Sequence, residues 1–350
     1  MKSSTVVGAM AVLLALAGPA AAARRLAQPG GGSTDGKTPI AWFGSGLLIE
    51  YYGGVAQVLA KAGVITKDTP LSGNSGGALA SAAIAMGLEF TDLIKLGGVL
   101  KSTGSPEAAL SAIVPDNVAS LLNGRVRMGI SQLDASQPTF NGSAAWVVDS
   151  YTDKADAMSA MFATSCLPCF LVNTSFCMFR DQPVLDGGYS VSWEQLCPGG
   201  DTANCIKVSA ETSTAIHLGQ LSGEECAAKL DTREEAVTQL YQNDLANAAE
   251  WPLADMADRC PEAEWEGQEP YVPKATMFEA FYPVVPDIYP GKYGPLPKLN
   301  GTEIRACDWA GWTRALPKGL ELEAAKAIYG QGVVDATAWL AERAKAGNKA

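Results

Sequence analysis

The chain has 350 residues, and its 37 Asp and Glu against 26 Lys and Arg leave a net charge of −11. This acidic balance, with no basic run in the sequence, argues against a nucleic-acid partner and against electrostatic docking on an anionic membrane. The sequence contains one histidine, which argues against a metal site because zinc sites ordinarily use several His or Cys ligands. We therefore expect no metal site.

The beginning of the chain has the pattern of a secretory signal peptide. Lys2 is followed by an apolar run from Val6 to Leu16 and by small residues up to Ala23, which are the charged, apolar and small-residue zones of such a signal. Residues 24–37 are rich in Gly, Ser and Thr and predict a flexible leader. We expect residues 1–23 to be the signal peptide and the folded part to begin at residue 38.

The cysteines agree with a secretory route. All eight lie beyond the signal, an even number that favours disulfides in an oxidising compartment, although the pairing is left open: Cys166, Cys169, Cys177, Cys197, Cys205, Cys226, Cys260 and Cys307. Cys166 and Cys169 have redox-motif spacing but lack the βαβ setting of such a motif. Sequons at Asn141, Asn173 and Asn300 are typical of a glycoprotein. We expect a secreted or lumenal protein, extracellular or vacuolar.

The folded part opens with a pattern of alternating strands and helices. An apolar strand is predicted over 38–43, a helix over 47–63, a second strand over 64–71, and a further Ala-rich helix over 76–86. A βαβα opening predicts a parallel sheet with helices packed on its faces.

The most informative feature is the turn between the second strand and its helix, where Ser75 stands between Gly73 and Gly77 in a G-x-S-x-G pattern. Glycine at both positions lets strand and helix fold closely together while the serine is thrust outward beside the helix N-terminus. Ser75 is therefore a candidate nucleophile. The alternative is a surface serine that caps a buried Gly/Ala helix.

Further elements follow along the chain. Helices are predicted over 88–100, 106–122 and 152–165, the last opened by Asp153, and strands over 125–130, 144–148, 184–185 and 206–210. Residues 319–347 predict a long amphipathic helix. Gly330 and Gly332 are expected to interrupt it.

A serine nucleophile needs a proton acceptor, and two arrangements are open. The first is a triad of Ser75, Asp186 and His217, in the chain order of α/β-hydrolases, although only two strands fit before Ser75 where that fold places several. The second is a dyad of Ser75 with Asp186, in which Gly187 and Gly188 let the chain turn sharply behind the carboxylate. The alternative for Asp186 is an ordinary turn after a strand.

With a dyad, the chain resembles the patatin-like phospholipase family. The resemblance covers roughly residues 38 to 220 and rests on segments found in the order of that family: Gly44-Ser45-Gly46 before a helix, Gly73-Asn74-Ser75-Gly76-Gly77, Ser165-Cys166-Leu167-Pro168, and Asp186-Gly187-Gly188.

The resemblance implies a three-layer α/β/α sandwich with a mostly parallel central sheet in residues 38–220, and a helical and irregular extension over 221–350 packed on the same domain. It also implies a lipid acyl hydrolase without a cofactor, making transient contact with a membrane surface and cleaving phospholipids or galactolipids. Ser75 would attack the ester, Asp186 would act as base, and backbone N–H groups would hold the oxyanion: Gly44, Ser45, Gly46 and Gly76.

One segment departs from the family pattern. Many members carry Arg or Lys and another Gly after the glycine-rich loop, where this chain has Leu47-Leu48-Ile49-Glu50. Without that cation, the oxyanion depends on backbone N–H groups and the helix dipole. Alternatives therefore stay open: a slow or catalytically silent relative acting in storage or binding, an esterase that depends on His217, and a disulfide-rich surface or matrix protein.

Overall fold

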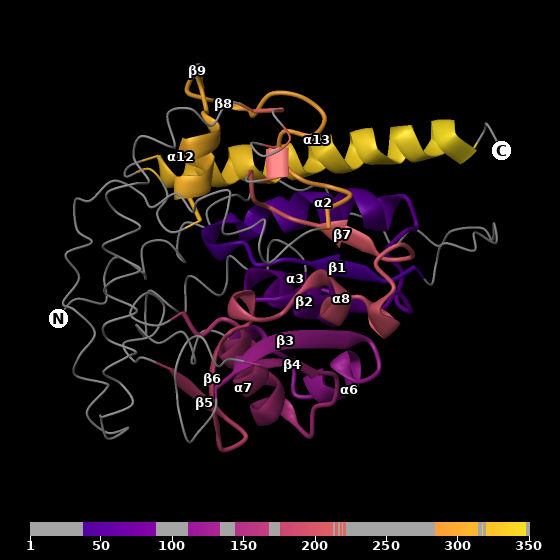
Figure 1. Ribbon diagram of the computed structural model, residues 1–350, viewed down its shortest axis with the longest axis vertical. Helices are drawn as coiled ribbons and strands as arrows, with labels where there is room; N and C mark the ends of the chain where they lie inside the picture. Colours follow the sequence, from indigo (N-terminus) through magenta and orange to yellow (C-terminus); the bar gives the residue numbers. More distant parts are fainter. Residues whose placement is uncertain are drawn as a thin grey trace.

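The computed structural model describes residues 38–88, 111–133, 144–167, 176–212, 214–215, 218, 220–221, 284–313, 317 and 320–347. The expected signal peptide and leader, His217, and the sequons at Asn141 and Asn173 lie outside the described residues. A seven-stranded sheet in the order β5-β6-β3-β2-β1-β7, with β4 also paired to β3, runs through the molecule (Figure 1).

The sheet is mostly parallel. Its strands are β1 (Ile40–Trp42), β2 (Leu71–Asn74), β3 (Val126–Gln132), β4 (Ala144–Val148), β5 (Cys177–Phe179), β6 (Gln182–Asp186) and β7 (Ile206–Val208). β7, β1, β2 and β3 are parallel, β6 is antiparallel to β3, and β5 is antiparallel to β6 and so shares the direction of β3. Only β4 and β6 among these strands run the other way. A small hairpin of β8 (Lys298–Leu299) and β9 (Thr302–Glu303) lies apart from this sheet.

Helices cover both faces of the sheet. They are α2 (Ile49–Lys61), α3 (Gly76–Met86), α6 (Val118–Leu122), α7 (Lys154–Thr164), α8 (Trp193–Leu196), α12 (Ala306–Gly311) and α13 (Glu321–Gly347), with short 3₁₀ turns at Gly46–Leu48, Gly187–Tyr189 and Pro198–Gly200. Side chains of β1 alternate between the faces. Ile40 and Trp42 belong to the core built with α2, α3 and α13, whereas Ala41 and Phe43 pack with Trp193 of α8. The expected α/β/α sandwich is confirmed.

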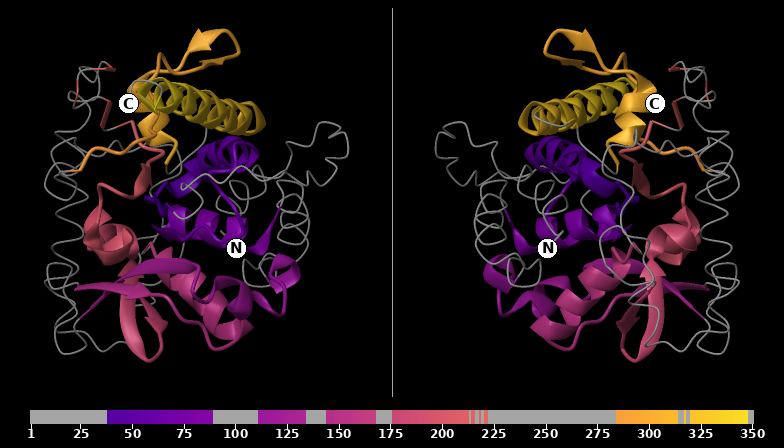
Figure 2. Two further views of the ribbon diagram at one scale, coloured as in Figure 1. Left: turned by 90° about the vertical axis from the view of Figure 1, so that its right-hand side faces the viewer. Right: turned by 90° about the vertical axis from the view of Figure 1, so that its left-hand side faces the viewer.

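Gly332 of α13 and Gly54 of α2 allow two helices to pack closely, and neither Gly330 nor Gly332 interrupts α13. α13 is continuous from Glu321 to Gly347 and lies beside α2 (Figures 1 and 2). A Cβ on Gly332 would overlap the carbonyl oxygen of Tyr51, and one on Gly54 would overlap that of Tyr329. The expected break at Gly330 and Gly332 is wrong because tertiary packing outweighs the low helix propensity of glycine.

Two other boundaries also differ from expectation. The second strand begins at Leu71 and not at Val64, because residues 64–70 form a turn in which the Thr69 hydroxyl accepts from the Thr66 N–H and donates to the Val64 carbonyl. Of the helix expected over 106–122, the structure describes residues from 111 onward. This helix ends at residue 113, before Pro115, and a second helix, α6, begins at Val118. Proline disfavours helical geometry in the residue before it. Most of the helix expected over 88–100 lies outside the described residues.

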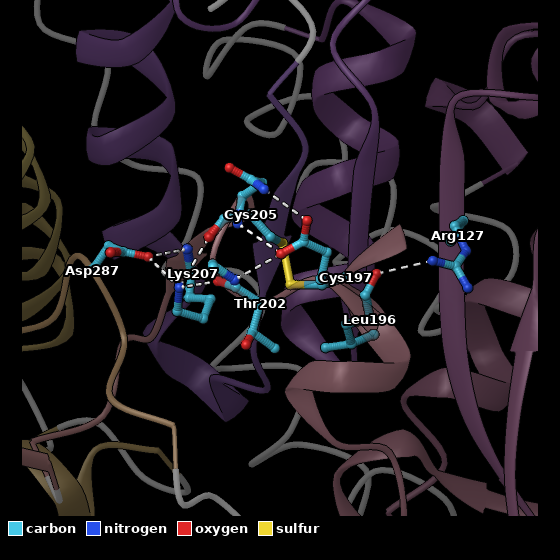
Figure 3. Close-up of a disulfide and its surroundings, with 10 residues drawn as sticks. Arg127, Leu196, Cys197, Thr202, Cys205, Lys207 and Asp287 are labelled. Atoms are coloured by element: carbon cyan, nitrogen blue, oxygen red, sulfur yellow. Dashed lines mark hydrogen bonds and ion pairs between the residues drawn. A yellow bond between two sulfur atoms is a disulfide. The ribbon is translucent and has the colours of Figure 1, made fainter. Parts of the chain in front are cut away.

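Two disulfides are described, Cys166–Cys177 and Cys197–Cys205. The Cys166-x-x-Cys169 spacing is therefore not a redox pair, since Cys166 bonds to Cys177. Figure 3 shows the second bridge, beside which the buried Lys207 amine donates to the carbonyls of Thr202 and Cys205 and pairs with Asp287 at 2.8 Å. Disulfides persist in oxidising compartments.

None of the helices in the described part of the chain, α13 included, combines the length and the apolar character needed to cross a membrane.

Candidate active site

Ser75 occupies a strained turn between β2 and α3. Its φ of 51° and ψ of −134° are unusual for a residue with a side chain. A Cβ on Gly73 would overlap the backbone of Gly77, and one on Gly77 would overlap the carbonyls of Trp42 and Phe43. The two glycines therefore permit the close approach of strand and helix that the sequence pattern predicts.

Thr164, at the end of α7, holds this turn in place. The Ser75 N–H donates to both the carbonyl and the hydroxyl oxygen of Thr164, each at 3.0 Å, and the Thr164 hydroxyl donates to the Gly129 carbonyl at 2.5 Å. Thr164 is fully buried. Sequence reasoning missed it, although it directly precedes the Ser165–Pro168 segment on which the family resemblance rests.

The pairing of β3 brings Ser75 and Asp186 together. β2 runs parallel to β3 and ends with Asn74 opposite Gly129, and β6 runs antiparallel and ends with Asp186 opposite Ile130, the next residue of β3. Two strands that approach from opposite directions thus finish at neighbouring positions of the same partner. A Cβ on Gly187 would lie 2.7 Å from the Asn74 Cβ, so the two strand ends are in contact.

Asp186 is a buried carboxyl group with a raised pKa. Its N–H donates to the Cys166 carbonyl at 2.8 Å, and its Oδ1 accepts from the Gly188 N–H at 2.7 Å. Burial raises the pKa of Asp186 to about 7, while the Ser75 side chain and the Gly188 N–H stabilise the ionised form and oppose that rise. A carboxylate with this pKa is a stronger base than an exposed one at neutral pH.

The contact between Ser75 and Asp186 is looser than a fully formed hydrogen bond. Among the described residues, Asp186 Oδ2 has no partner of ordinary hydrogen-bond geometry, although the serine side chain is close enough to favour the ionised carboxylate. Ser75 is 5 % exposed and Asp186 is 3 % exposed. Catalytic hydrogen bonds commonly tighten only when substrate is bound.

The glycine-rich loop lies against the serine turn. A Cβ on Gly44 would be 3.4 Å from the Ser75 Cβ, and one on Gly76 would overlap the Ser45 hydroxyl. Gly46 has a φ of 51° and fits closely against Thr313. Within the described residues, the N–H groups of Gly44, Ser45, Gly46 and Gly76 donate to no backbone or side-chain acceptor. They therefore remain the predicted donors of an oxyanion hole.

Glu50 follows this loop, in the first turn of α2. It is 2 % exposed, and burial raises its pKa to about 8. Glu50 is thus mostly uncharged at neutral pH and places no negative charge behind the loop. The segment after the loop brings neither a cation nor, at neutral pH, a full anion.

The structure brings Ser75 and Asp186 together with the Gly44–Gly46 loop and the turn at Gly187. His217 lies outside the described residues. A scan against protein-family models and a search of curated proteins found no match. A search of solved structures found VipD from Legionella pneumophila, 14% identical, with a TM-score of 0.40, covering 86% of this chain and 67% of that one.

Proposed function

We propose that this chain is a serine hydrolase that cleaves carboxylic esters of lipids through a Ser75/Asp186 dyad. The observation that carries the proposal is the meeting of two strand ends at Gly129 and Ile130 of β3, which puts a strained serine in contact with a buried carboxyl group of raised pKa. The lipid substrate, of phospholipid or galactolipid type, rests on the family resemblance of the four sequence segments.

The dyad supports a two-step reaction. Ser75 Oγ attacks the ester carbonyl and passes its proton to the Asp186 carboxylate, while the free N–H groups of the loop and of Gly76 stabilise the oxyanion. The tetrahedral intermediate expels the alcohol, which takes the proton from Asp186, and leaves an acyl-enzyme. Asp186 then accepts a proton from water as that water attacks the acyl group, and it returns the proton to Ser75 Oγ as the fatty acid leaves, which restores both side chains.

Replacing the nucleophile tests the proposal. Purified mature protein incubated with a mixed-lipid extract is expected to release free fatty acid, and Ser75→Ala is expected to lower that rate by roughly a thousand-fold or more, because nucleophile and base act as a unit. A fluorophosphonate should label the parent protein at Ser75.

Ser120→Ala changes an exposed serine of α6 and should leave the rate unchanged. Loss of activity in His217→Ala would favour the triad in place of the dyad. A folded parent that releases no fatty acid and takes up no label would contradict the proposal and leave a storage, binding or surface role.

A further inference from the structure

Asn74, the last residue of β2, lies between the two loops of the candidate site. Its side chain is fully buried. A Cβ on Gly187 would lie 2.7 Å from the Asn74 Cβ, and one on Gly44 would lie 3.9 Å from the Asn74 Oδ1. The same point on Gly44 is 3.4 Å from the Ser75 Cβ. The carboxamide of Asn74 therefore faces the glycine-rich loop on the side where Ser75 approaches it.

The polar atoms of this carboxamide are unpaired. Among the described residues, neither Asn74 Nδ2 nor Asn74 Oδ1 has a hydrogen-bond partner. Among its described neighbours, the Ser75 N–H pairs with Thr164 and the Gly188 N–H pairs with Asp186 Oδ1, whereas Asp186 Oδ2 also has no partner. A buried amide with neither donor nor acceptor satisfied destabilises the fold and calls for a specific reason.

We propose that Asn74 is a side-chain donor of the oxyanion hole, giving an Nδ2–H hydrogen bond to the ester oxygen as its negative charge develops. This inference rests on the proposed hydrolase function. A half-turn of the carboxamide exchanges Nδ2 and Oδ1, so either atom can face Gly44. A fixed neutral donor in a buried site needs no reorganisation during the reaction. It adds a side-chain donor in a chain whose glycine-rich loop is followed by Leu47-Leu48-Ile49-Glu50 and not by a cation.

Two substitutions separate this role from a structural one. Asn74→Leu keeps the approximate shape without polar atoms. Asn74→Asp keeps the shape but loses its donor only when ionised, so this variant is assayed at alkaline pH, because burial raises the pKa of a carboxyl group. Both are expected to lower kcat on a lipid ester by about 100- to 1,000-fold with KM within about threefold, the usual effect of losing one oxyanion donor. Labelling of Ser75 by a fluorophosphonate should slow by a similar factor. The Tm of Asn74→Leu should equal or exceed that of the parent, because the change removes unsatisfied polar atoms.

Asn123 provides the matched control. Its carboxamide donates to the Tyr151 carbonyl at 2.9 Å and accepts from the Tyr151 N–H at 2.7 Å, so Asn123→Leu should lower Tm and leave kcat unchanged. An Asn74→Leu protein that turns over within threefold of the parent, or loses as much Tm as Asn123→Leu, overturns the role of Asn74 alone. A parent that neither hydrolyses lipid nor is labelled overturns the proposed function as well.

Discussion

At the residue scale, the burial of Asp186 has opposite consequences for its proposed role as a base and for the stability of the fold. Burial raises its pKa to about 7, against an ordinary value of about 3.9. The same burial that makes it a useful base near neutral pH makes its ionised form costly to keep in the folded protein. Among the described residues, no cation shares a salt bridge with it to offset that cost.

The pKa of Asp186 predicts how activity and stability vary with pH. Between about pH 4 and pH 7 the unfolded chain loses this proton while the folded chain keeps it, so the contribution of the group to stability is fully present below pH 4 and is lost as pH rises to 7. At pH 8, Asp186→Asn should therefore have a free energy of unfolding that exceeds that of the parent by up to about 4 kcal/mol, measured by urea unfolding. At pH 4 the two proteins should unfold at similar urea concentrations. The kcat/KM of the parent should rise with pH through about 7.

Asp68→Asn, at an exposed side chain, is the control and should shift the unfolding midpoint little at either pH. A parent whose kcat/KM is constant from pH 5 to 9, with Asp186→Asn no more stable than the parent at pH 8, would show that Asp186 carries no raised pKa.

At the scale of elements, glycines set the contact between α2 and α13. Gly54 and Gly332 bring the two backbones close, and the Tyr51 hydroxyl donates to Asp335 at 2.8 Å across the same interface. The Asp335 carboxylate also accepts from Gln331 at 3.0 Å. The C-terminal helix is thereby fixed to the helix that follows the glycine-rich loop of the site.

The two glycines of α13 should respond to alanine in opposite ways. In Gly332→Ala the added methyl group would overlap the Tyr51 carbonyl oxygen. This change should destabilise the protein by about 1 to 3 kcal/mol, the usual effect of overpacking. Gly330→Ala meets open space and should stabilise it by up to about 1 kcal/mol through helix propensity. Urea unfolding of both variants measures the difference, and equal midpoints would refute this account of the interface.

These elements show which parts of the structure a pattern can predict. The strand over 144–148 and the helix opened by Asp153 follow the sequence closely, because a short apolar run with β-branched residues and an N-cap are local signals: the Asp153 side chain accepts from the Asp156 N–H at 2.9 Å. The continuity of α13 through Gly332 could not be predicted, because the reason lies on another helix.

The candidate site divides in the same way. The G-x-S-x-G turn and the Asp-Gly-Gly turn are visible in the sequence, since close backbone contacts require glycine there. The support from Thr164 and the unpaired amide of Asn74 are not visible, because both depend on segments that meet only in the folded chain. Asn74 occupies a position that the G-x-S-x-G pattern leaves free, and Thr164 lies outside the four segments, so a single sequence points to neither role.

At the scale of the whole molecule, one disulfide is linked to the site by a backbone hydrogen bond, and the other lies in the apolar cluster around Trp193. Cys166 bonds to Cys177, and the Cys166 carbonyl accepts a hydrogen bond from the Asp186 N–H. Thr164, two residues earlier in the chain, accepts one from the Ser75 N–H. The Cys197–Cys205 bridge instead joins the end of α8 to the start of β7, on the other face of the sheet. The two bridges close loops of similar length, with sequence separations of 11 and 8.

Removing each bridge should separate stability from activity. Replacing both cysteines of either pair by serine should cost about 2 to 3 kcal/mol, because the loops that the bridges close are short and similar in length. Only the Cys166/Cys177 double variant should also lower kcat, by at least about tenfold, since a displacement of roughly 1 Å in a site can have a large effect on rate. Lipid hydrolysis under conditions where both variants remain folded checks this, and equal kcat values would argue against a role of the first bridge in holding the dyad.

Because β2 and β6 both end beside β3, the pairing with β3 sets the spacing between Ser75 and Asp186. Between Ser75 and Asp186 the chain runs 186 − 75 = 111 positions, yet their spacing depends on a single step, from Gly129 to Ile130. The loops and helices between the two residues, outside β3, can lengthen or shorten over evolution without separating the Ser75 hydroxyl from the Asp186 carboxyl group. One residue gained or lost within that step of β3 would shift the carboxyl group by about 3.3 Å and turn the following side chains to the other face.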